Sequence, residues 1–350
     1  MNTVGATTRL AIIDHGEPVV RFLAAIGTLG RDPRFAYTTI VVHPLAATPW
    51  YAREADEALF VPAGTDAAGV VAALRDAGVT ALVCGDAAAY APVVDLLAEA
   101  ESTGLHVVGC GAQALARLSD PAALAAVGSE AGVTVDPGAS NYRDLEVDTL
   151  TDAHGTTWTL GVREVTVRSG DHLVLAEYPA VLAPEVARGM EEAARTLVRA
   201  SGATGAVTVS FTLADDEVTY AVCRAAASRP VHAGVEETTG ASFVELQLRV
   251  NAGETLGEAP PQGDGATVEA SLLALDPLRE GEATGGALRL LSLPVGTGVR
   301  VDASRREDDV VDPESDPSSR RSRPGDAIAV RRSPASGALS TGWASSSTAA

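Results

Sequence analysis

The first 120 residues alternate short apolar runs with segments whose apolar residues recur at helical spacing. The runs that predict strands lie at residues 9–13, 38–42, 58–61, 81–84 and 106–108. The segments that predict helices lie at residues 19–29, 67–77, 91–103 and 112–118. Because each strand is followed by a helix, this part of the chain is expected to form a parallel, doubly wound sheet with helices on both faces.

The middle of the chain changes to alternating apolar and polar positions, which is typical of half-buried strands in hairpins. Residues 207–211 and 218–222 flank the polar turn 214–217 and predict a β-hairpin. Two more strands are predicted at residues 145–150 and 158–162, and an amphipathic helix is predicted at residues 184–200. From about residue 303 Ser, Ala, Arg and Pro dominate without apolar periodicity, so this tail is expected to be disordered.

Composition limits the classes of partner. The 350 residues are 46% hydrophobic and carry a net charge of −20, which disfavours nucleic acid and anionic membranes as partners. No apolar run approaches the roughly 18 residues of a membrane span, and the start has no signal-peptide pattern, so the sequence predicts a cytoplasmic protein. Cys84, Cys110 and Cys223 are far apart and odd in number, which favours small buried side chains over a disulfide framework or a zinc site.

Lysine is absent, so all 26 basic residues are arginine. This excludes every chemistry that needs a lysine amine from this chain, including Schiff bases, the P-loop lysine, biotinyl-lysine and a lysine on ATP phosphates. A GC-rich genome, which favours arginine and alanine codons, is one explanation of the missing lysine. The chemical consequence is the same whatever its origin.

Several segments together carry a family resemblance. They are Asp14-His15-Gly16-Glu17 after the first strand, GVTALVCG at 78–85, GLHVVGCGAQALARLSD at 104–120, RDLEV at 143–147 and SFVELQLRVNA at 242–252. In order and spacing, with the hairpin between them, they resemble the biotin carboxylase domain of actinobacterial acyl-CoA carboxylase α subunits, an ATP-grasp family. The resemblance implies an α/β fold with an N-terminal doubly wound parallel sheet, then an ATP-grasp α+β domain and a small β-rich C-terminal domain.

The chain departs from this family in the middle domain. The family's lid, with its glycine-rich loop and phosphate-binding lysine, is missing between the segment ending near Asn141 and the strand starting at Arg143. We therefore predict a biotin-carboxylase-like N-terminal domain at 1–121, a truncated ATP-grasp-like domain without lid at 122–262 and a partial C-terminal β domain at 263–303. Residues 304–350 are assigned to the disordered tail.

The resemblance also indicates where site residues fall. The family's two metal-binding glutamates fall at Ser210 and Val222, and its catalytic glutamate falls near Val231. The family arginine that stabilises the biotin enolate is retained as Arg300, and His232 stands in a histidine position. One extra residue lies between Ser210 and Gly240, so assignments after Val222 can shift by one. Although the family uses ATP, Mg²⁺ and biotin on a carrier, the lost carboxylates lead us to expect no cofactor and no metal here.

Each of these residues also has a structural interpretation. Glu217, Glu236 and Glu237 are nearby acids that would replace the metal ligands, but they fall in a hairpin turn and a loop. In this interpretation Arg300 is an arginine at the end of a strand that pairs with a surface acid. His232 is then a histidine that packs against other residues or faces solvent.

Two further stretches contain reactive residue types. The Asp14 to Glu17 stretch indicates a helix cap more than a metal or catalytic site. Cys223 beside Arg224 suggests either a thiol of lowered pKa or a buried side chain, and burial on the hairpin is favoured.

The sequence thus predicts a biotin-carboxylase-like protein that is catalytically inactive and serves as a non-catalytic partner of carboxylase subunits. One alternative is an active ATP-dependent ligase completed by another chain, and another is a decayed gene product. Loss of the lid is expected to expose an apolar patch around Val207, Val209, Val218 and Val222, which would favour an oligomer.

Overall fold

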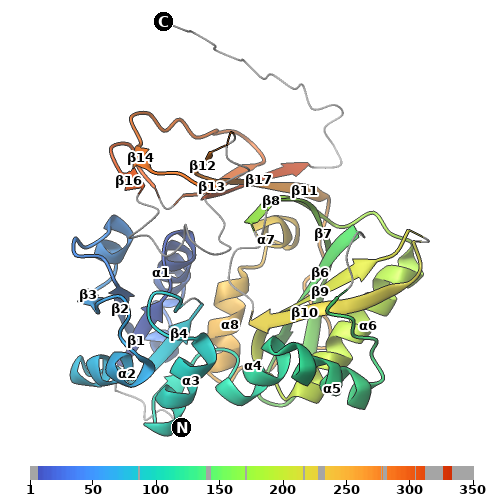
Figure 1. The fold of residues 1–350 in the computed structure, drawn as a ribbon, viewed down its shortest axis with the longest axis horizontal. Helices are drawn as coiled ribbons and strands as arrows, with labels where there is room; N and C mark the ends of the chain where they lie inside the picture. Colours follow the sequence, from blue (N-terminus) through green and yellow to red (C-terminus); the bar gives the residue numbers. More distant parts are fainter. Residues whose placement is uncertain are drawn as a thin grey trace, which may run out of the picture.

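The computed structural model describes residues 7–85, 87–138, 143–169, 172–215, 217–227, 233–276, 278, 282–303, 305–311 and 326–332. Figure 1 shows an N-terminal α/β region beside a large antiparallel sheet, with the C-terminal strands above both. None of the described helices is long and apolar enough to cross a membrane.

The N-terminal region is the predicted doubly wound sheet. Five parallel strands lie in the order β3-β2-β1-β4-β5. The strands are β1 (Thr8–Ile13), β2 (Tyr37–His43), β3 (Glu57–Phe60), β4 (Ala81–Cys84) and β5 (His106–Val107). The helices that follow are α1 (Glu17–Leu29), α2 (Ala67–Asp76), α3 (Val93–Ser102), α4 (Ala112–Ser119) and α5 (Pro121–Ala131), with 3₁₀ turns η1 (Pro33–Phe35) and η2 (Trp50–Glu54).

Alternation along β1 divides the apolar residues between the two faces of this sheet. Leu10 and Ile12 pack with Phe22 of α1 on one face. Ala11 and Ile13 join the core formed with α2 and α3 on the other face. Both faces are therefore covered, which is why the strands read as continuous apolar runs.

The second sheet is antiparallel and has eight strands in the order β10-β9-β6-β7-β8-β11-β17-β15. Its strands are β6 (Arg143–Thr151), β7 (Thr157–Ser169), β8 (His172–Tyr178), β9 (Gly205–Leu213), β10 (Tyr220–Ala227), β11 (Ala266–Leu272), β15 (Val299–Asp302) and β17 (Asp326–Arg332). The accompanying helices are α6 (Pro184–Ser201), α7 (Ala233–Thr239) and α8 (Phe243–Asn251). The fold class expected from the sequence is confirmed, including the antiparallel second half.

The apolar face of the large sheet is covered, contrary to the expectation of an exposed patch. Val207, Val209 and Val222 are fully buried, and only Val218, before β10, is exposed. Helices α4, α5 and α6 lie over this face (Figure 1) and complete one core with it. These three valines face the helices, so the argument for an oligomer from an exposed patch is wrong.

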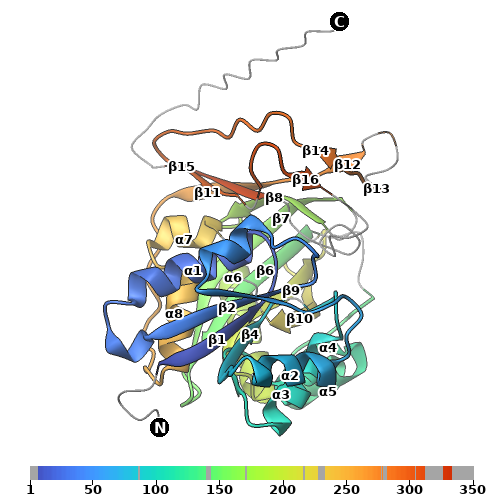
Figure 2. The same cartoon turned by 90° about the vertical axis from the view of Figure 1, so that its left-hand side faces the viewer.

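Part of the segment assigned to a disordered tail forms strands. β17 pairs with β11 on one side and β15 on the other, and β16 (Val310–Val311) pairs with β14 (Gly286–Ala287). A short hairpin joins β12 (Leu275–Asp276) to β13 (Glu282–Ala283). A strand inside a sheet is held by main-chain hydrogen bonds on both edges, so it needs no strong apolar periodicity. Figure 2 shows this C-terminal layer above the rest of the molecule.

Candidate functional site

Polar and charged side chains gather on the face of the large sheet opposite to helices α4 to α6. Glu146 and Asp148 alternate with the core residues Leu145 and Val147 along β6. Because successive side chains of a strand point to opposite faces, the two acids lie on the face away from the core. Both are nonetheless more than 90% buried.

Arg163 of β7 is the cation at the centre of this face. It forms an ion pair with Glu146, and Asp148 and Glu269 also act on it. Burial alone would lower the pKa of Arg163, but attraction by the three carboxylates outweighs it, so the pKa is raised. The guanidinium is therefore held permanently charged inside the protein.

For two of the acids around Arg163, burial is the larger influence on the pKa. Burial raises the pKa values of Asp148 and Glu269, and attraction by Arg163 opposes this rise. The hydroxyl of Thr208 donates to Asp148 at 2.7 Å, and the backbone N–H of Gly234 donates to Glu269 at 3.3 Å. Glu269 thus joins β11 to the start of α7.

Glu146 is shared among several donors. Arg168 of β7 reaches it at 3.0 Å, and the hydroxyl of Ser210 lies 3.4 Å from it. The exposed Arg224 lies 3.7 Å away. A carboxylate surrounded by guanidinium groups is already neutralised, so it is a poor ligand for a divalent cation.

Ser210 and Val222, at which the resemblance places the family's metal ligands, lie on different faces of the sheet. Ser210 faces Glu146, whereas Val222 is fully buried in the apolar core and pairs with Val135 through an isolated bridge. A bulge between Val222 and Arg224 shifts the register, so Arg224 is the residue opposite Ser210. The one-residue shift anticipated in the family positions after Val222 stays a prediction.

Cys223 lies in this bulge, with its thiol 3.4 Å from the carbonyl oxygen of Ser210. Burial raises the pKa of the Cys223 thiol, and the smaller lowering effect of Arg224 does not offset it. The geometry favours the buried interpretation of this cysteine over a reactive thiolate.

Arg300 lies in a second cluster between the C-terminal layer and α7. Its guanidinium reaches Glu236 at 2.9 Å, Asp302 at 2.9 Å and Glu237 at 3.4 Å. Burial acts to lower the pKa of Arg300, but Asp302 and Glu236 raise it overall. Its partners are not all surface acids as the structural interpretation supposed, since Glu236 is buried and also pairs with Arg21 of α1.

The remaining predicted residues do not assemble into a metal site. Glu236 and Glu237 pair with Arg300, and Glu217 is exposed near Arg143. Among the residues that the structure describes, no group of three His, Cys, Asp or Glu side chains is placed to hold a metal ion. His232 and Val231 lie outside the described residues, so the predictions for them stay untested.

Gly16 occupies the N-cap position of α1 with a positive φ of 69° and has no side chain to form a cap. The predicted cap by Asp14 or Glu17 stays a prediction. Glu17 pairs with Arg21 one turn later, at 3.4 Å. Gly16 tolerates this backbone conformation because it has no Cβ. Through Arg21, Glu17 belongs to the same buried cluster as Glu236.

The residues that sequence reasoning overlooked are Arg163, Glu146, Glu269 and Arg21. Three acids within the strand 143–151, Asp144, Glu146 and Asp148, were the available signal, because acids in a buried strand need a cation nearby. Which arginine supplies it depends on strands far apart in the chain.

Comparison with known proteins agrees with this geometry. Residues 103–259 match the family model described as carbamoyl-phosphate synthase L chain, ATP binding domain. Biotin carboxylase 2 of Bacillus subtilis is 31% identical over 178 residues, covering 50% of this chain and 40% of that protein. The chain is related to the biotin carboxylases. Methylcrotonoyl-CoA carboxylase subunit alpha of Rattus norvegicus is 32% identical over 181 residues, covering 50% of this chain and 25% of that one.

The fold of this biotin carboxylase relative also matches solved structures. A biotin carboxylase from Campylobacter jejuni, solved as an ATP complex, superposes with a TM-score of 0.81 at 17% identity. The match covers 94% of this chain and 88% of that one. By sequence, however, the chain spans less than half the length of the curated relatives that it matches.

These relatives correct one prediction. The sequence led us to expect no cofactor, but the related proteins are biotin carboxylases, and one similar structure was solved as an ATP complex. The inference from two lost carboxylates to no cofactor was too broad, because a nucleotide site uses many more contacts than the metal ligands.

Proposed function

We propose that this chain is a biotin-carboxylase-like protein without carboxylation activity of its own, acting as a non-catalytic partner of acyl-CoA carboxylase subunits. The observation that carries the proposal is the pairing of Ser210 with Arg224 across β9 and β10. The resemblance places two metal-binding carboxylates on these strands, and a hydroxyl beside a guanidinium does not supply the anionic oxygens that Mg²⁺ requires.

The second cluster supports the same proposal. Arg300, the retained family arginine, contacts Glu236, Glu237 and Asp302. An arginine that stabilises a developing oxyanion must aim hydrogen-bond donors at it. Three acids around one guanidinium compete for those donors, so Arg300 acts here as a link between β15 and α7.

The association part of the proposal rests on the names of the relatives. They include alpha chains or subunits of propionyl-CoA and methylcrotonoyl-CoA carboxylases, as well as biotin carboxylases. A chain that keeps this fold without the two carboxylates would contribute to an assembly by binding partner subunits through its surface.

The proposal is tested with the purified full chain, alone and mixed with carboxylase subunits. We expect no bicarbonate-dependent ATP hydrolysis and no fixation of labelled bicarbonate on free biotin by the chain alone. Ser210→Glu should also stay inactive, since the carboxylate on β10 is still missing. Light scattering of the mixture should report a complex heavier than either the 35.6 kDa chain or the free subunit alone.

Each contrary result has a clear meaning. Turnover by the chain alone contradicts the proposal. Turnover that appears only on mixing, and is lost in Ser210→Ala, supports instead a ligase completed by another chain. Absence of any complex with carboxylase subunits removes the partner role and leaves the decayed gene product as the explanation.

A further inference from the structure

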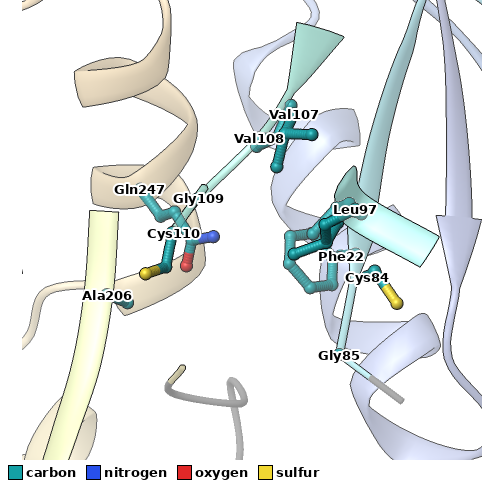
Figure 3. A pocket seen from close by; sticks show the side chains of 11 residues that line it. Phe22, Cys84, Gly85, Leu97, Val107, Val108, Gly109, Cys110, Ala206 and Gln247 are labelled. Atoms are coloured by element: carbon teal, nitrogen blue, oxygen red, sulfur yellow. The ribbon is translucent and has the colours of Figure 1, made fainter. Parts of the chain in front are cut away.

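The small pocket beyond β4 and β5 belongs to the core of the molecule. Cys84 ends β4, and Gly109 and Cys110 follow β5 on the other side (Figure 3). The enclosed space is about 20 Å³, which holds one water molecule and no larger ligand. A surface for recognition is found instead on the large sheet.

Two helices cover opposite faces of the large sheet and leave part of one face open. Helix α6 contacts β6, β7 and β9. Helix α7 contacts β11 and β17 from the other face, where Gly234 bonds to Thr267 and Glu269. Figure 2 shows the strands β8, β11 and β15 above both helices.

The face of β11 that points away from α7 is apolar and exposed. Val268 and Leu272 are 41% and 48% exposed, whereas Thr267 and Glu269 are buried on the face toward α7. Side chains alternate between the two faces of a strand, so Val268, Ala270 and Leu272 share the exposed face.

The apolar surface continues over the neighbouring strands. Val167 of β7 lies opposite Leu175 of β8, and Leu175 lies opposite Ala270 of β11. The pairing of β11 with β17 and of β17 with β15 continues this row to Val301. Val167 is 42% exposed. Neighbouring strands lie about 4.8 Å apart, so the row across five strands is about 20 Å long.

We call this surface the outer face. It is formed by Val167, Leu175, Val268, Ala270 and Leu272. Single exposed apolar residues are ordinary on a protein surface, but a contiguous group of them marks an interaction site.

Glu177 of β8 places an unbalanced charge at the border of the outer face. It lies opposite Val268 on β11 and opposite Glu164 on β7. Arg143 neutralises Glu164 at 2.7 Å. Within the described part of the chain, the Glu177 carboxylate accepts only from the hydroxyl of Thr166, at 3.2 Å. Like charges opposite one another destabilise a sheet, so a cation beside Val268 would relieve the repulsion between the two acids.

Charge favours a basic partner over a second copy of this chain. The net charge of −20 makes two copies repel each other. A segment that carries arginine or lysine next to apolar side chains complements both the outer face and Glu177. Protein interfaces are enriched in arginine, which combines a long apolar stem with a charge.

We propose that the outer face is the docking surface for carboxylase subunits, and that it takes an apolar segment of the partner whose arginine or lysine pairs with Glu177. The inference rests on the partner role proposed above and assigns that role to one surface. The apolar side chains of the segment lie against Val268, Ala270 and Leu272. Contact with the partner shields the cation and Glu177 from water, which strengthens their attraction.

The test measures the affinity of purified carboxylase subunits for the full chain by isothermal titration calorimetry. Leu272→Glu places a charge in the contact and should weaken binding about tenfold or more. Glu177→Arg should also weaken it, because attraction becomes repulsion. Val218→Glu is the matched control, since Val218 is 65% exposed outside the outer face and its replacement should leave the affinity unchanged.

The salt dependence separates the apolar contribution from the ionic one. The affinity of the natural chain should fall as the salt concentration rises, because salt screens the pairing of Glu177 with the partner's cation. Glu177→Gln should flatten this dependence, whereas Leu272→Ala should weaken binding and keep it. A structural role of Glu177 alone would leave the salt dependence unchanged.

The contrary results are distinguishable. Affinity that survives both Leu272→Glu and Glu177→Arg overturns the outer face as the docking surface and leaves the partner role intact. Absence of any complex with the natural chain overturns both. Equal weakening by Val218→Glu also contradicts the proposal, because the net charge and not this surface then controls binding. Glu177→Arg decides the question if Leu272→Glu does not fold, since it replaces a half-buried side chain and removes the repulsion from Glu164.

Discussion

Replacement of Arg163 by methionine should be among the most destabilising single changes in this chain. The Arg163 side chain is 3% exposed and lies among Glu146, Asp148 and Glu269, each less than 10% exposed. Removal of one partner of a buried pair leaves an uncompensated charge, at a cost of about 3–5 kcal/mol. Typical domains unfold at about 5–15 kcal/mol, so the loss is a large part of the total.

The assay is urea unfolding followed by circular dichroism, at pH 8 and at pH 5.5. Arg195→Met is the matched control, because Arg195 pairs on the surface with the exposed Glu192 and should change stability by less than about 1 kcal/mol. Without Arg163 the buried acids take up protons more readily, so the deficit of Arg163→Met should shrink at the lower pH. Adding Glu146→Gln should recover part of the loss at pH 8.

Two results would refute this reasoning. The first is an Arg163→Met variant no less stable than Arg195→Met. The second is a deficit that does not depend on pH, since that would mean the loss comes from packing and not from the charge left behind.

Three other predictions test different contacts. Val222→Glu should lower the free energy of unfolding by about 2 kcal/mol or more, because it places a carboxylate in the apolar core. Arg224→Gln, at an exposed position, should change it by less than about 0.5 kcal/mol. Equal effects of the two variants in urea unfolding would contradict the strand register that the bulge produces. Burial raises the pKa of Glu269 in the folded chain, so protonated Glu269 stabilises the fold below its unfolded pKa of 4.5, and this stabilisation is lost as pH rises through the folded pKa. Glu269→Gln should flatten that part of the curve of unfolding free energy against pH, measured by urea unfolding. Arg306 stacks 3.8 Å from the ring centroid of Trp50, so Arg306→Ala should shift the Trp50 emission to longer wavelength and cost about 0.5–1 kcal/mol, and an unchanged spectrum would show that the two are apart in solution.

The order and type of the elements could be predicted from the sequence with good accuracy. The strand at 81–84 has the predicted bounds, and α1 extends the helix predicted at 19–29 by two residues. Local periodicity determines such elements, because burial of one face needs apolar residues at a fixed interval. The resemblance to biotin carboxylases was also available from local motifs, and the comparisons confirm it.

The candidate site was predicted less well, because its geometry depends on strand register. The hairpin was placed at 207–211 and 218–222, whereas β10 runs from Tyr220 to Ala227 and contains a bulge. A shift of one residue moves a side chain to the opposite face of a sheet. In the folded chain Arg224 lies opposite Ser210, and Val222 lies opposite Phe211.

The sequence by itself determined a doubly wound sheet followed by an antiparallel one, the absence of lysine, and the absence of acidic residues from 207–211 and 218–222. Tertiary structure decided which charges meet. Arg163, Glu269 and Arg21 come from β7, β11 and α1, and Arg300 reaches Glu236 across 64 residues. No local pattern encodes such pairs, because a buried charge is stabilised by whichever opposite charge the packing of distant elements brings within a few ångströms.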